Sequence, residues 1–318
     1  MSQPNRASTH LDQILTDFSL AQFQSESVFR AADILPTKTV TKQSNKYFVY
    51  DKDAFARDDV QLRAAGTESN GTGFKLSNDS YYCDKYSLHV DLSYDEISEA
   101  DSPLNLEQDA AFLIAQQMLQ KRERLVAGAT FKTGVWGLDV DGASTTKWSD
   151  YVASDPIATI DSAAKAILLG SFNNPSTLIL GLDVFNALKS HPDLNRTLNV
   201  TGPQDEAGIA RQLGVSRIIV PRAIGITGNE DKTGTPGFIW NPKCALLLSN
   251  PTSVGLRSPA AGMMFAWTGA ADAPRPNGVV SRRLEMPSTQ SVRIESDMTL
   301  DVKITGPSMG VFFNNIVA

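Results

Sequence analysis

The chain has 318 residues, of which 42% are hydrophobic, and it carries a formal net charge of −6 with an isoelectric point near 5.2. This composition predicts a globular protein of about two domains with a real hydrophobic core. The acidic balance argues against a protein that binds nucleic acid by neutralising phosphates, because that mode needs clustered lysine and arginine. Any contact with DNA should therefore be weak and non-specific.

The two cysteines, Cys83 and Cys244, lie far apart in the sequence and form no C-x-x-C pair. Neither a disulfide framework nor a zinc site is indicated, and we expect two buried thiols in a reducing compartment. The amino terminus lacks the apolar core of a secretion signal, and the longest apolar runs are far below membrane-spanning length. We therefore expect a soluble intracellular protein.

The first 45 residues carry one short helical pattern, Leu11, Ile14, Leu15 and Phe18, in an otherwise polar stretch. A segment that is partly apolar but too small to form a core usually lies on a neighbouring surface, either of its own subunit or of another. We interpret this segment as an arm.

Residues 47–92 contain two stretches rich in aromatic and β-branched residues, separated by a centre that includes Gly66, Gly71 and Gly73. This pattern predicts a long β-hairpin ribbon. The ribbon carries many charges, so it cannot be buried on both faces within one chain, and isolated two-stranded ribbons are marginal in water. We expect the ribbon to complete its folding against another molecule.

Residues 102–128 repeat apolar side chains at helical spacing over roughly seven turns, which predicts one long helix. Asn105 can cap its start with Gln108 as the reciprocal partner, and Gly128 can end it. At 1.5 Å per residue the helix spans roughly 35 Å, too long for a small domain to cover alone. Another element must therefore lie across it.

The next part of the chain, after a strand and turn at 131–148, alternates helices with strands and predicts an α/β unit over residues 153–257. Its expected helices cover 157–169, 182–188 and 205–213, and its expected strands cover 176–181, 216–221 and 238–248.

The final part reads as strands at 263–267, 291–304 and 311–317, with the period-two alternation of a sheet that has one wet face. Such a sheet needs a cover, and the long helix is the available apolar partner. We therefore expect residues 258–318 to pack against residues 100–150, which makes the α/β unit an insertion between them.

Three short motifs match catalytic or metal-binding sequences but lack the context that such sites need. Residues 306–310 match G-x-S-x-G, yet no helix and no histidine follow them, so we interpret them as a tight turn between strands. Residues 139–142 lack the closing glutamate of a calcium loop, and residues 228–233 lack the glycine of a phosphate-binding loop. We interpret both as turns or solvated loops.

The three histidines, His10, His89 and His191, fall in the arm, the ribbon and a helix end, where surface or strand positions are expected. The carboxylates before the long helix are expected to form a solvated face. We predict no catalytic residues, no metal site, no cofactor and no enzymatic activity.

This order of parts resembles the major capsid proteins of tailed double-stranded DNA phages, which share the Hong Kong 97 capsid fold. The matching segments occur in the family's order over most of the chain. They are Arg63–Gly66 with Thr67 and Glu68, then Tyr82–Tyr86, Asp109–Ala111, Arg122–Arg124, and Leu180–Leu188 followed by His191 and Pro192.

The resemblance implies an α+β fold built from an arm, an extended hairpin loop and two domains. In this division residues 1–46 form the N-arm and residues 47–99 the extended loop. Residues 100–152 and 258–318 form a peripheral domain with the long helix as its spine, and residues 153–257 form the inserted axial domain.

The resemblance also implies self-assembly as pentamers and hexamers into the icosahedral head shell around the double-stranded DNA genome, with assembly in the host cytoplasm and a final place in the virion. A separate scaffolding protein, a portal and decoration proteins are the further expected partners, and no membrane is involved. We expect no covalent cross-link between Lys75 and Asn70 or Asn78. The expected subunit-interface residues are the ribbon charges Arg57, Asp58, Asp59, Arg63, Glu68 and Lys75.

Two rival interpretations remain open on the sequence alone. One is an intracellular enzyme built on the α/β unit with the ribbon as an oligomerisation arm, which a polar pocket with perturbed pKa values would favour. The other is a secreted or surface binding module, against which the missing signal sequence weighs.

Overall fold

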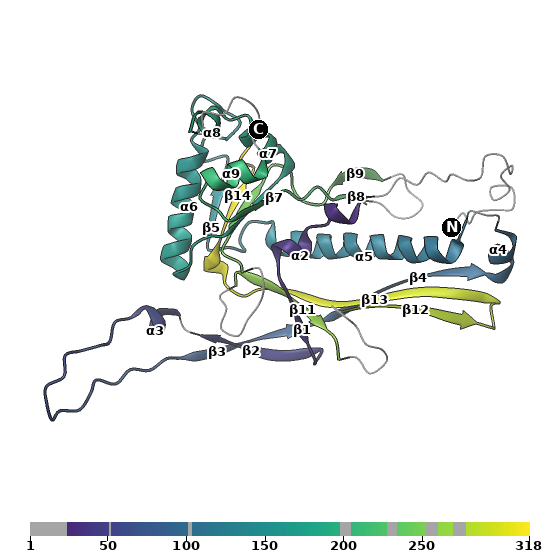
Figure 1. The fold of residues 1–318 in the computed structure, drawn as a ribbon, viewed down its shortest axis with the longest axis horizontal. Helices are drawn as coiled ribbons and strands as arrows, with labels where there is room; N and C mark the ends of the chain where they lie inside the picture. The colour runs from purple at the N-terminus through teal and green to yellow at the C-terminus, as the bar shows by residue number, and fades with distance from the viewer. Residues whose placement is uncertain are drawn as a thin grey trace.

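The structure is a computed structural model that describes residues 24–50, 52–100, 104–197, 205–227, 234–251, 260–269 and 278–318. The helical pattern at 11–18, His10 and the loop at 228–233 lie outside the described residues. The molecule is elongated around one long helix, α5 (Leu106–Thr130), with a compact α/β unit at one end of it and a long sheet running beneath it (Figure 1).

The predicted long helix is confirmed with its cap. The Asn105 side chain accepts a hydrogen bond from the backbone N–H of Gln108 at 3.2 Å, which satisfies one of the free donors of the first turn. The helix continues through Gly128 and ends at Thr130, so the predicted glycine stop is wrong. Thr130 donates its hydroxyl to the carbonyl of Val126 inside the last turn.

The sheet beneath α5 contains β1 (Thr37–Val40), β11 (Gly262–Trp267), β13 (Ser291–Ile304) and β12 (Val279–Met286) in that order, and β4 (Asp84–Ser93) also pairs with β13. The predicted packing of the return sheet on the helix is confirmed. Buried side chains of α5 and β13 form one cluster, comprising Ala110, Ile114, Met118, Val292, Ile294, Met298 and Leu300.

Residues 84–92 do not belong to the ribbon, contrary to the prediction. They form β4, which pairs antiparallel with β13 from Asp84↔Leu300 to Ser93↔Ser291. The reason is burial, because alternate residues of β4, such as Val90 and Leu92, pack on the cluster under α5. The ribbon itself is the pair β2 (Ser44–Tyr50) and β3 (Leu76–Tyr82).

The α/β unit is built on a second sheet with the order β5-β14-β10-β6-β7, flanked by helices. Its strands are β5 (Leu138–Asp141), β14 (Gly310–Asn314), β10 (Ala245–Leu248), β6 (Thr177–Leu180) and β7 (Arg217–Ile219). Its helices are α6 (Pro156–Ser171), α7 (Leu182–Lys189), α8 (Pro192–Thr197) and α9 (Glu206–Gln212).

The placement of β14 corrects the expectation that residues 311–317 join the return sheet. β14 lies between β5 and β10 of the α/β sheet, where Val311, Phe312 and Phe313 are all buried. A strand covered on both faces needs a continuous apolar run rather than alternation. The two sheets are therefore tied together by the carboxyl-terminal segment, which passes from β13 through η3 (Pro307–Met309) to β14.

The segment predicted as an arm, residues 1–46, packs on its own subunit in its described second half. Ile34 and Leu35 are fully buried, α2 (Ala31–Ile34) packs on α5, and β1 pairs in parallel with β11. Of the two surfaces that the prediction allowed, its own subunit or another, the described part of the segment therefore lies on its own. Residues 24–30, with η1 (Glu26–Val28), lead into it along α5.

The remaining elements are short. They are α3 (Lys52–Ala56) in the extended loop, α4 (Tyr94–Glu99) before the spine, and the two-stranded ribbon β8 (Ile224–Thr227) with β9 (Thr235–Phe238). Glu96 is one of the carboxylates that were expected to form a solvated face. It caps the start of α4, where Ser93 and Glu96 exchange hydrogen bonds in a capping box. Within the described residues, no helix combines the length and apolarity that crossing a membrane requires.

Candidate subunit interface

The β2–β3 ribbon projects from the body as an extended loop, and its far end lies well away from both sheets (Figure 1). The strands pair from Ser44↔Tyr82 to Tyr50↔Leu76, and residues 57–75 beyond them form no regular element. The predicted ribbon with a glycine-rich centre is confirmed for these residues. Every described residue from 60 to 80 is exposed, so this part of the chain has almost no contact with its own core.

The base of the loop is fixed to the body by aromatic packing. The ring of Tyr81 stacks on Phe265 of β11 at 4.5 Å between centroids, and Tyr47 lies 5.5 Å from the same ring. Tyr47 also donates its hydroxyl to Asp79 at 2.6 Å; burial and this hydrogen bond raise the pKa of Tyr47, and the same bond lowers the pKa of Asp79. The loop is therefore held firmly at its origin and free of the body at its tip.

The six charged residues predicted for the interface all lie in the outer part of the loop. Two of them form hydrogen bonds within the loop itself. Asp59 accepts hydrogen bonds from Asn70 at its backbone carbonyl and from Thr72 at its carboxylate, and Arg63 donates to the carbonyl of Thr67. These bonds give the tip a local shape without burying it. Arg57, Asp58, Glu68 and Lys75 are exposed around it.

The sequence reasoning missed the apolar residues of this loop. The rings of Tyr50, Phe55 and Phe74 lie 6.0–6.2 Å apart in a mutual cluster, yet Phe55 is 68% exposed and Phe74 is 62% exposed. Beyond them Val60 and Leu62 are almost completely exposed at the tip. Aromatic residues on both sides of a glycine-rich centre are the signal that would have found them.

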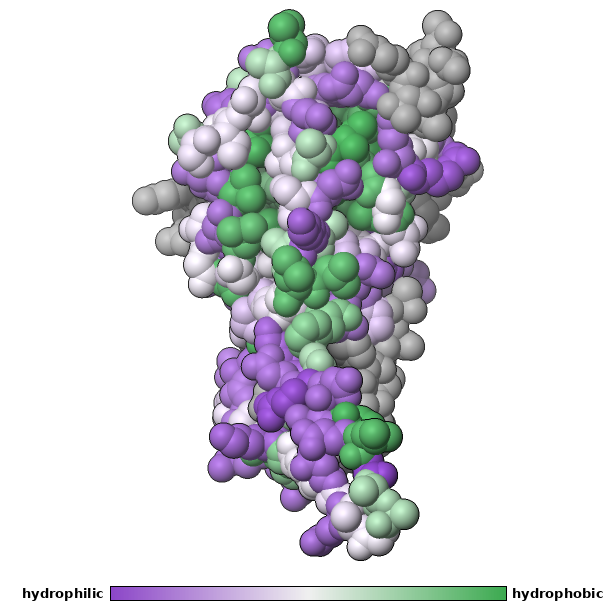
Figure 2. All heavy atoms as spheres, turned by 90° about the vertical axis from the view of Figure 1, so that its left-hand side faces the viewer, coloured by the Kyte–Doolittle hydropathy of each residue, from purple (hydrophilic) through white to green (hydrophobic). Residues whose placement is uncertain are grey.

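A second exposed apolar patch lies where the loop leaves the body, at the carboxyl end of α6. Leu168, Leu169 and Phe172 are exposed there, and green surface marks the face that carries α6 and the loop in Figure 2. Lys52 of α3 donates to the carbonyl of Gly170 and lies 6.0 Å from the centre of the Phe172 ring. A lysine at the negative end of a helix dipole is favourable, so this contact orients the loop relative to the α/β unit.

A buried carboxylate joins the spine to both neighbouring parts of the fold. Glu123 of α5 is fully buried and accepts hydrogen bonds from the backbone N–H of Ala31 and the indole N–H of Trp240, each at 2.6 Å. Burial raises the pKa of Glu123, and the two hydrogen bonds and the charge of Arg122 oppose that shift. This junction fixes the segment before β1 and the α/β unit on one turn of the spine.

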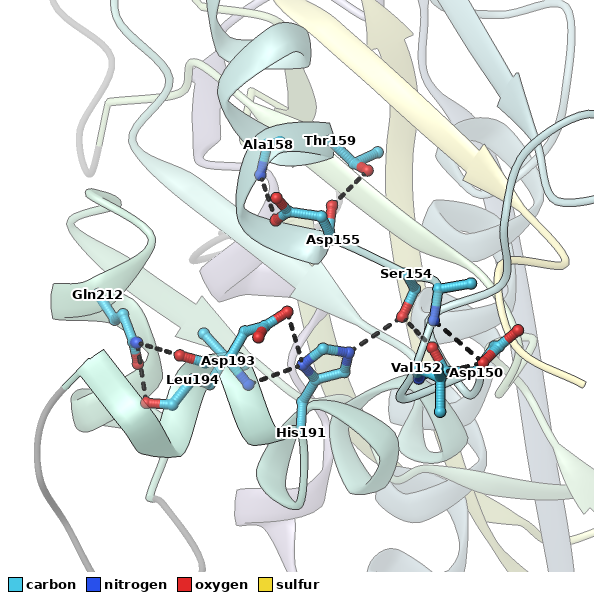
Figure 3. A network of polar contacts seen from close by, with 11 residues as sticks. Asp150, Val152, Ser154, Asp155, Ala158, Thr159, His191, Asp193, Leu194 and Gln212 are labelled. Carbon is cyan, nitrogen blue, oxygen red and sulfur yellow. Dashed lines mark hydrogen bonds and ion pairs between the residues drawn. The ribbon is translucent and has the colours of Figure 1, made fainter.

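The α/β unit contains one arrangement that resembles a serine hydrolase triad (Figure 3). His191 was expected at a surface or strand position, but its side chain is fully buried. Its Nε2 lies 3.0 Å from Ser154 Oγ, and its Nδ1 lies 3.8 Å from a carboxylate oxygen of Asp193.

The hydrogen bonds around His191 point the wrong way for catalysis. The backbone N–H of Asp193 donates to Nδ1 at 3.3 Å, so Nδ1 is an acceptor and Nε2 carries the proton. Nε2 therefore donates to Ser154, whose hydroxyl donates to the carbonyl of Asp150. A general base needs a free Nε2 facing the serine proton. This network is a structural brace between two loops, and it does not favour the enzyme interpretation.

The other motifs with a chemical resemblance also have structural roles. Residues 306–310 form the turn around η3, as predicted, and a Cβ on Gly310 would lie 2.2 Å from the ring of Trp136. Both cysteines are buried thiols, as predicted, and burial raises the pKa of Cys83 to about 11. In the described part of the chain, no three His, Cys, Asp or Glu side chains gather in a way that would hold a metal ion.

Known proteins match this chain in sequence and in fold, although no protein-family model matches it. The chain is 26% identical over 188 residues to the major capsid protein of Burkholderia phage BcepMu, a match that covers 58% of the chain and spans about 59% of that protein. A phage-related protein from Bordetella bronchiseptica RB50 has a TM-score of 0.69 at 16% identity, over 92% of this chain and 94% of that one. The capsid structure of cyanophage P-SCSP1u has a TM-score of 0.60 at 11% identity, over 94% and 90% of the two chains.

Proposed function

Because the chain has the Hong Kong 97 capsid fold, we propose that it is the major capsid protein of a tailed phage, a structural subunit that assembles with its own copies into the icosahedral head shell. The sequence match to the BcepMu capsid protein supports this proposal. In this account pentamers and hexamers form in the host cytoplasm and close around the double-stranded DNA of the virion. The chain itself has a structural rather than a catalytic role.

The observation that carries the proposal is the extended loop with apolar side chains at its end. Val60 and Leu62 stand in solvent on a loop whose base is fixed to the body. Burying such a side chain stabilises a contact by about 1.5–3 kcal/mol, so leaving several of them exposed on a protruding loop is unfavourable unless a partner covers them. A second copy of the chain is the partner that a shell supplies.

The six charged loop residues have a different role in this proposal. Four of them flank Val60 and Leu62 in sequence, and none of the six is buried in the subunit, as expected for a polar rim around an interface core. Rim charges govern the rate and register of association more than its strength. Arg57, Asp58, Asp59, Arg63, Glu68 and Lys75 would therefore guide the loop onto its neighbour, while Val60 and Leu62 would hold it there.

The test replaces the two apolar tip residues with aspartate in the full chain, as V60D/L62D. The matched control is Q61D/S69D, which adds the same charge to the same tip but keeps Val60 and Leu62. Sedimentation and negative-stain electron microscopy should show shells for the control and only unassembled, folded subunits for V60D/L62D. Shells formed by V60D/L62D at the wild-type yield would contradict the proposal.

A further inference from the structure

The β8–β9 ribbon beside the spine has two unlike faces. Its register pairs Ile224 with Phe238, Gly225 with Gly237, and Ile226 with Pro236. In an antiparallel pair, alternate residues share a face, so the two glycines lie on one side and the four apolar residues on the other.

On this side of the ribbon, Gly225 of β8 lies against the spine, whereas Gly237 of β9 is exposed. A Cβ on Gly225 would come within 2.6 Å of the Arg124 guanidinium, which donates a hydrogen bond to the carbonyl of Ile226 at 2.9 Å. The absence of a side chain at Gly225 therefore leaves room for the Arg124 guanidinium, which links β8 to α5. Because neighbouring residues of a strand point to opposite sides, Ile224 and Ile226 lie on the side of β8 opposite to Gly225.

The outward face is apolar over its whole described length. Ile226 is 57% exposed, and Ile224, Pro236 and Phe238 are also exposed. A two-stranded ribbon is marginally stable in water, and one that shows only apolar side chains on its open face needs a cover.

The first described residue of the chain contacts this ribbon. Gln24 is the first described residue, and its side chain pairs with the backbone of Ile224 in both directions, donating to the carbonyl at 2.6 Å and accepting from the N–H at 2.9 Å. Gln116 of the spine donates to the backbone carbonyl of Gln24 at 3.1 Å. Gln24 is thereby fixed beside β8.

The tethered sequence has the composition that such a face would bind. Leu11, Ile14, Leu15 and Phe18 follow the i, i+3, i+4, i+7 spacing of an amphipathic helix. Five residues lie between Phe18 and Gln24, and six extended steps from one to the other span at most about 20 Å. The segment can therefore reach the ribbon of its own chain without leaving the subunit.

We propose that the amphipathic segment 11–18 docks through Leu11, Ile14, Leu15 and Phe18 on the apolar face of the β8–β9 ribbon in the same chain. The effective concentration of a tethered segment is high, which favours this occupant over one from solution. The docked segment covers Ile224, Ile226, Pro236 and Phe238 in the unassembled subunit. This docking does not depend on shell assembly.

The first test is a cross-link in the unassembled V60D/L62D background. Leu15→Cys with Ile226→Cys, treated with copper phenanthroline, should form an intramolecular disulfide, because the native thiols of Cys83 and Cys244 are buried. The control pair joins Leu15→Cys to Leu169→Cys, an exposed apolar position on α6. Equal cross-linking of both pairs would overturn the proposal. So would a link that forms only between subunits of assembled wild-type-loop particles.

The second test measures hydrogen exchange in a chain that lacks residues 1–20. Amides of β8 and β9 should exchange at least tenfold faster than in the full-length subunit, while the buried strand β10 should keep its protection. Unchanged exchange in β8 and β9 would overturn the proposal. Loss of protection in β10 as well would show general unfolding of the truncated chain. The proposal would then stand or fall on whether Leu15→Cys forms the disulfide with Ile226→Cys.

Discussion

The buried carboxylate of Glu123 accepts the indole N–H of Trp240 at 2.6 Å, although 117 residues separate the two in sequence. The same carboxylate accepts the backbone N–H of Ala31 at 2.6 Å. One side chain of the spine thus satisfies donors from the amino-terminal segment and from the α/β unit. The relative position of the two parts of the fold depends on this contact.

Glu123→Ala should destabilise the unassembled subunit by roughly 2–4 kcal/mol, because it leaves two buried donors without an acceptor. Urea unfolding followed by tryptophan fluorescence measures the loss. A double-mutant cycle with Trp240→Phe separates the pair from the cavity, since the two losses should be clearly non-additive. Additive losses would show that the hydrogen bond contributes little.

His191 should make the subunit less stable in mild acid. Burial lowers the pKa of His191 below its ordinary value of 6.5, so the unfolded chain binds a proton more readily than the folded one. The stability from the neutral ring is complete above about pH 6.5 and is lost as the pH falls toward the folded-state pKa, by at most about 1.4 kcal/mol per pH unit. Thermal unfolding between pH 7.5 and 5 measures this slope, and His191→Gln should flatten it. If His191→Gln showed the same loss of stability with falling pH, another group and not His191 would be responsible for it.

Two glycine substitutions should change stability in opposite directions. Gly310→Ala should destabilise by about 1–3 kcal/mol, because its Cβ would overlap the buried ring of Trp136. Gly128→Ala should stabilise by about 0.5–1 kcal/mol, since it lies in α5 with open space around its Cβ. Melting temperatures of the two variants give the comparison directly. A tolerated alanine at position 310 would mean that this turn adapts more than its packing indicates.

The aromatic residues of the extended loop should matter for assembly and not for folding. Phe55→Ser with Phe74→Ser should leave the unfolding free energy of the subunit within about 0.5 kcal/mol, because both rings are largely exposed. If each ring is buried between subunits, the loss of about 1.5–3 kcal/mol per ring raises the protein concentration needed for assembly at least tenfold. Light scattering against concentration measures the shift. The conservative pair Phe55→Leu with Phe74→Leu keeps the apolar area and should assemble nearly normally.

Local signals in the sequence predicted the elements that are locally determined. The apolar spacing and the Asn105 cap predicted α5, and Asp155 before Pro156 marked the start of α6, where its side chain caps Ala158. The ribbon was predicted from its turn glycines and strand residues. These features depend on neighbours within a few residues, which the sequence shows directly.

Pairings between distant segments could not be predicted in the same way. An apolar run such as Val311–Phe313 fits either sheet, and only the packing selects β10 as its partner. β12 was not predicted, because its sequence contains the charged residues Arg282 and Arg283. Their ion pairs with Asp297 and Glu107 exist only in the folded chain. The exposed cluster of Tyr50, Phe55 and Phe74 was not predicted either. Aromatic residues are usually assigned to the core, and the sequence does not show that these three lie outside it.

Copies of this chain are proposed to assemble with one another into a closed shell. The mass of the particles formed by the purified full-length protein tests this most directly. Light scattering and negative-stain electron microscopy on the same preparation should find closed particles of uniform diameter built from rings of five and six subunits. A single species near the subunit mass of 34.4 kDa at every salt and protein concentration would contradict the claim.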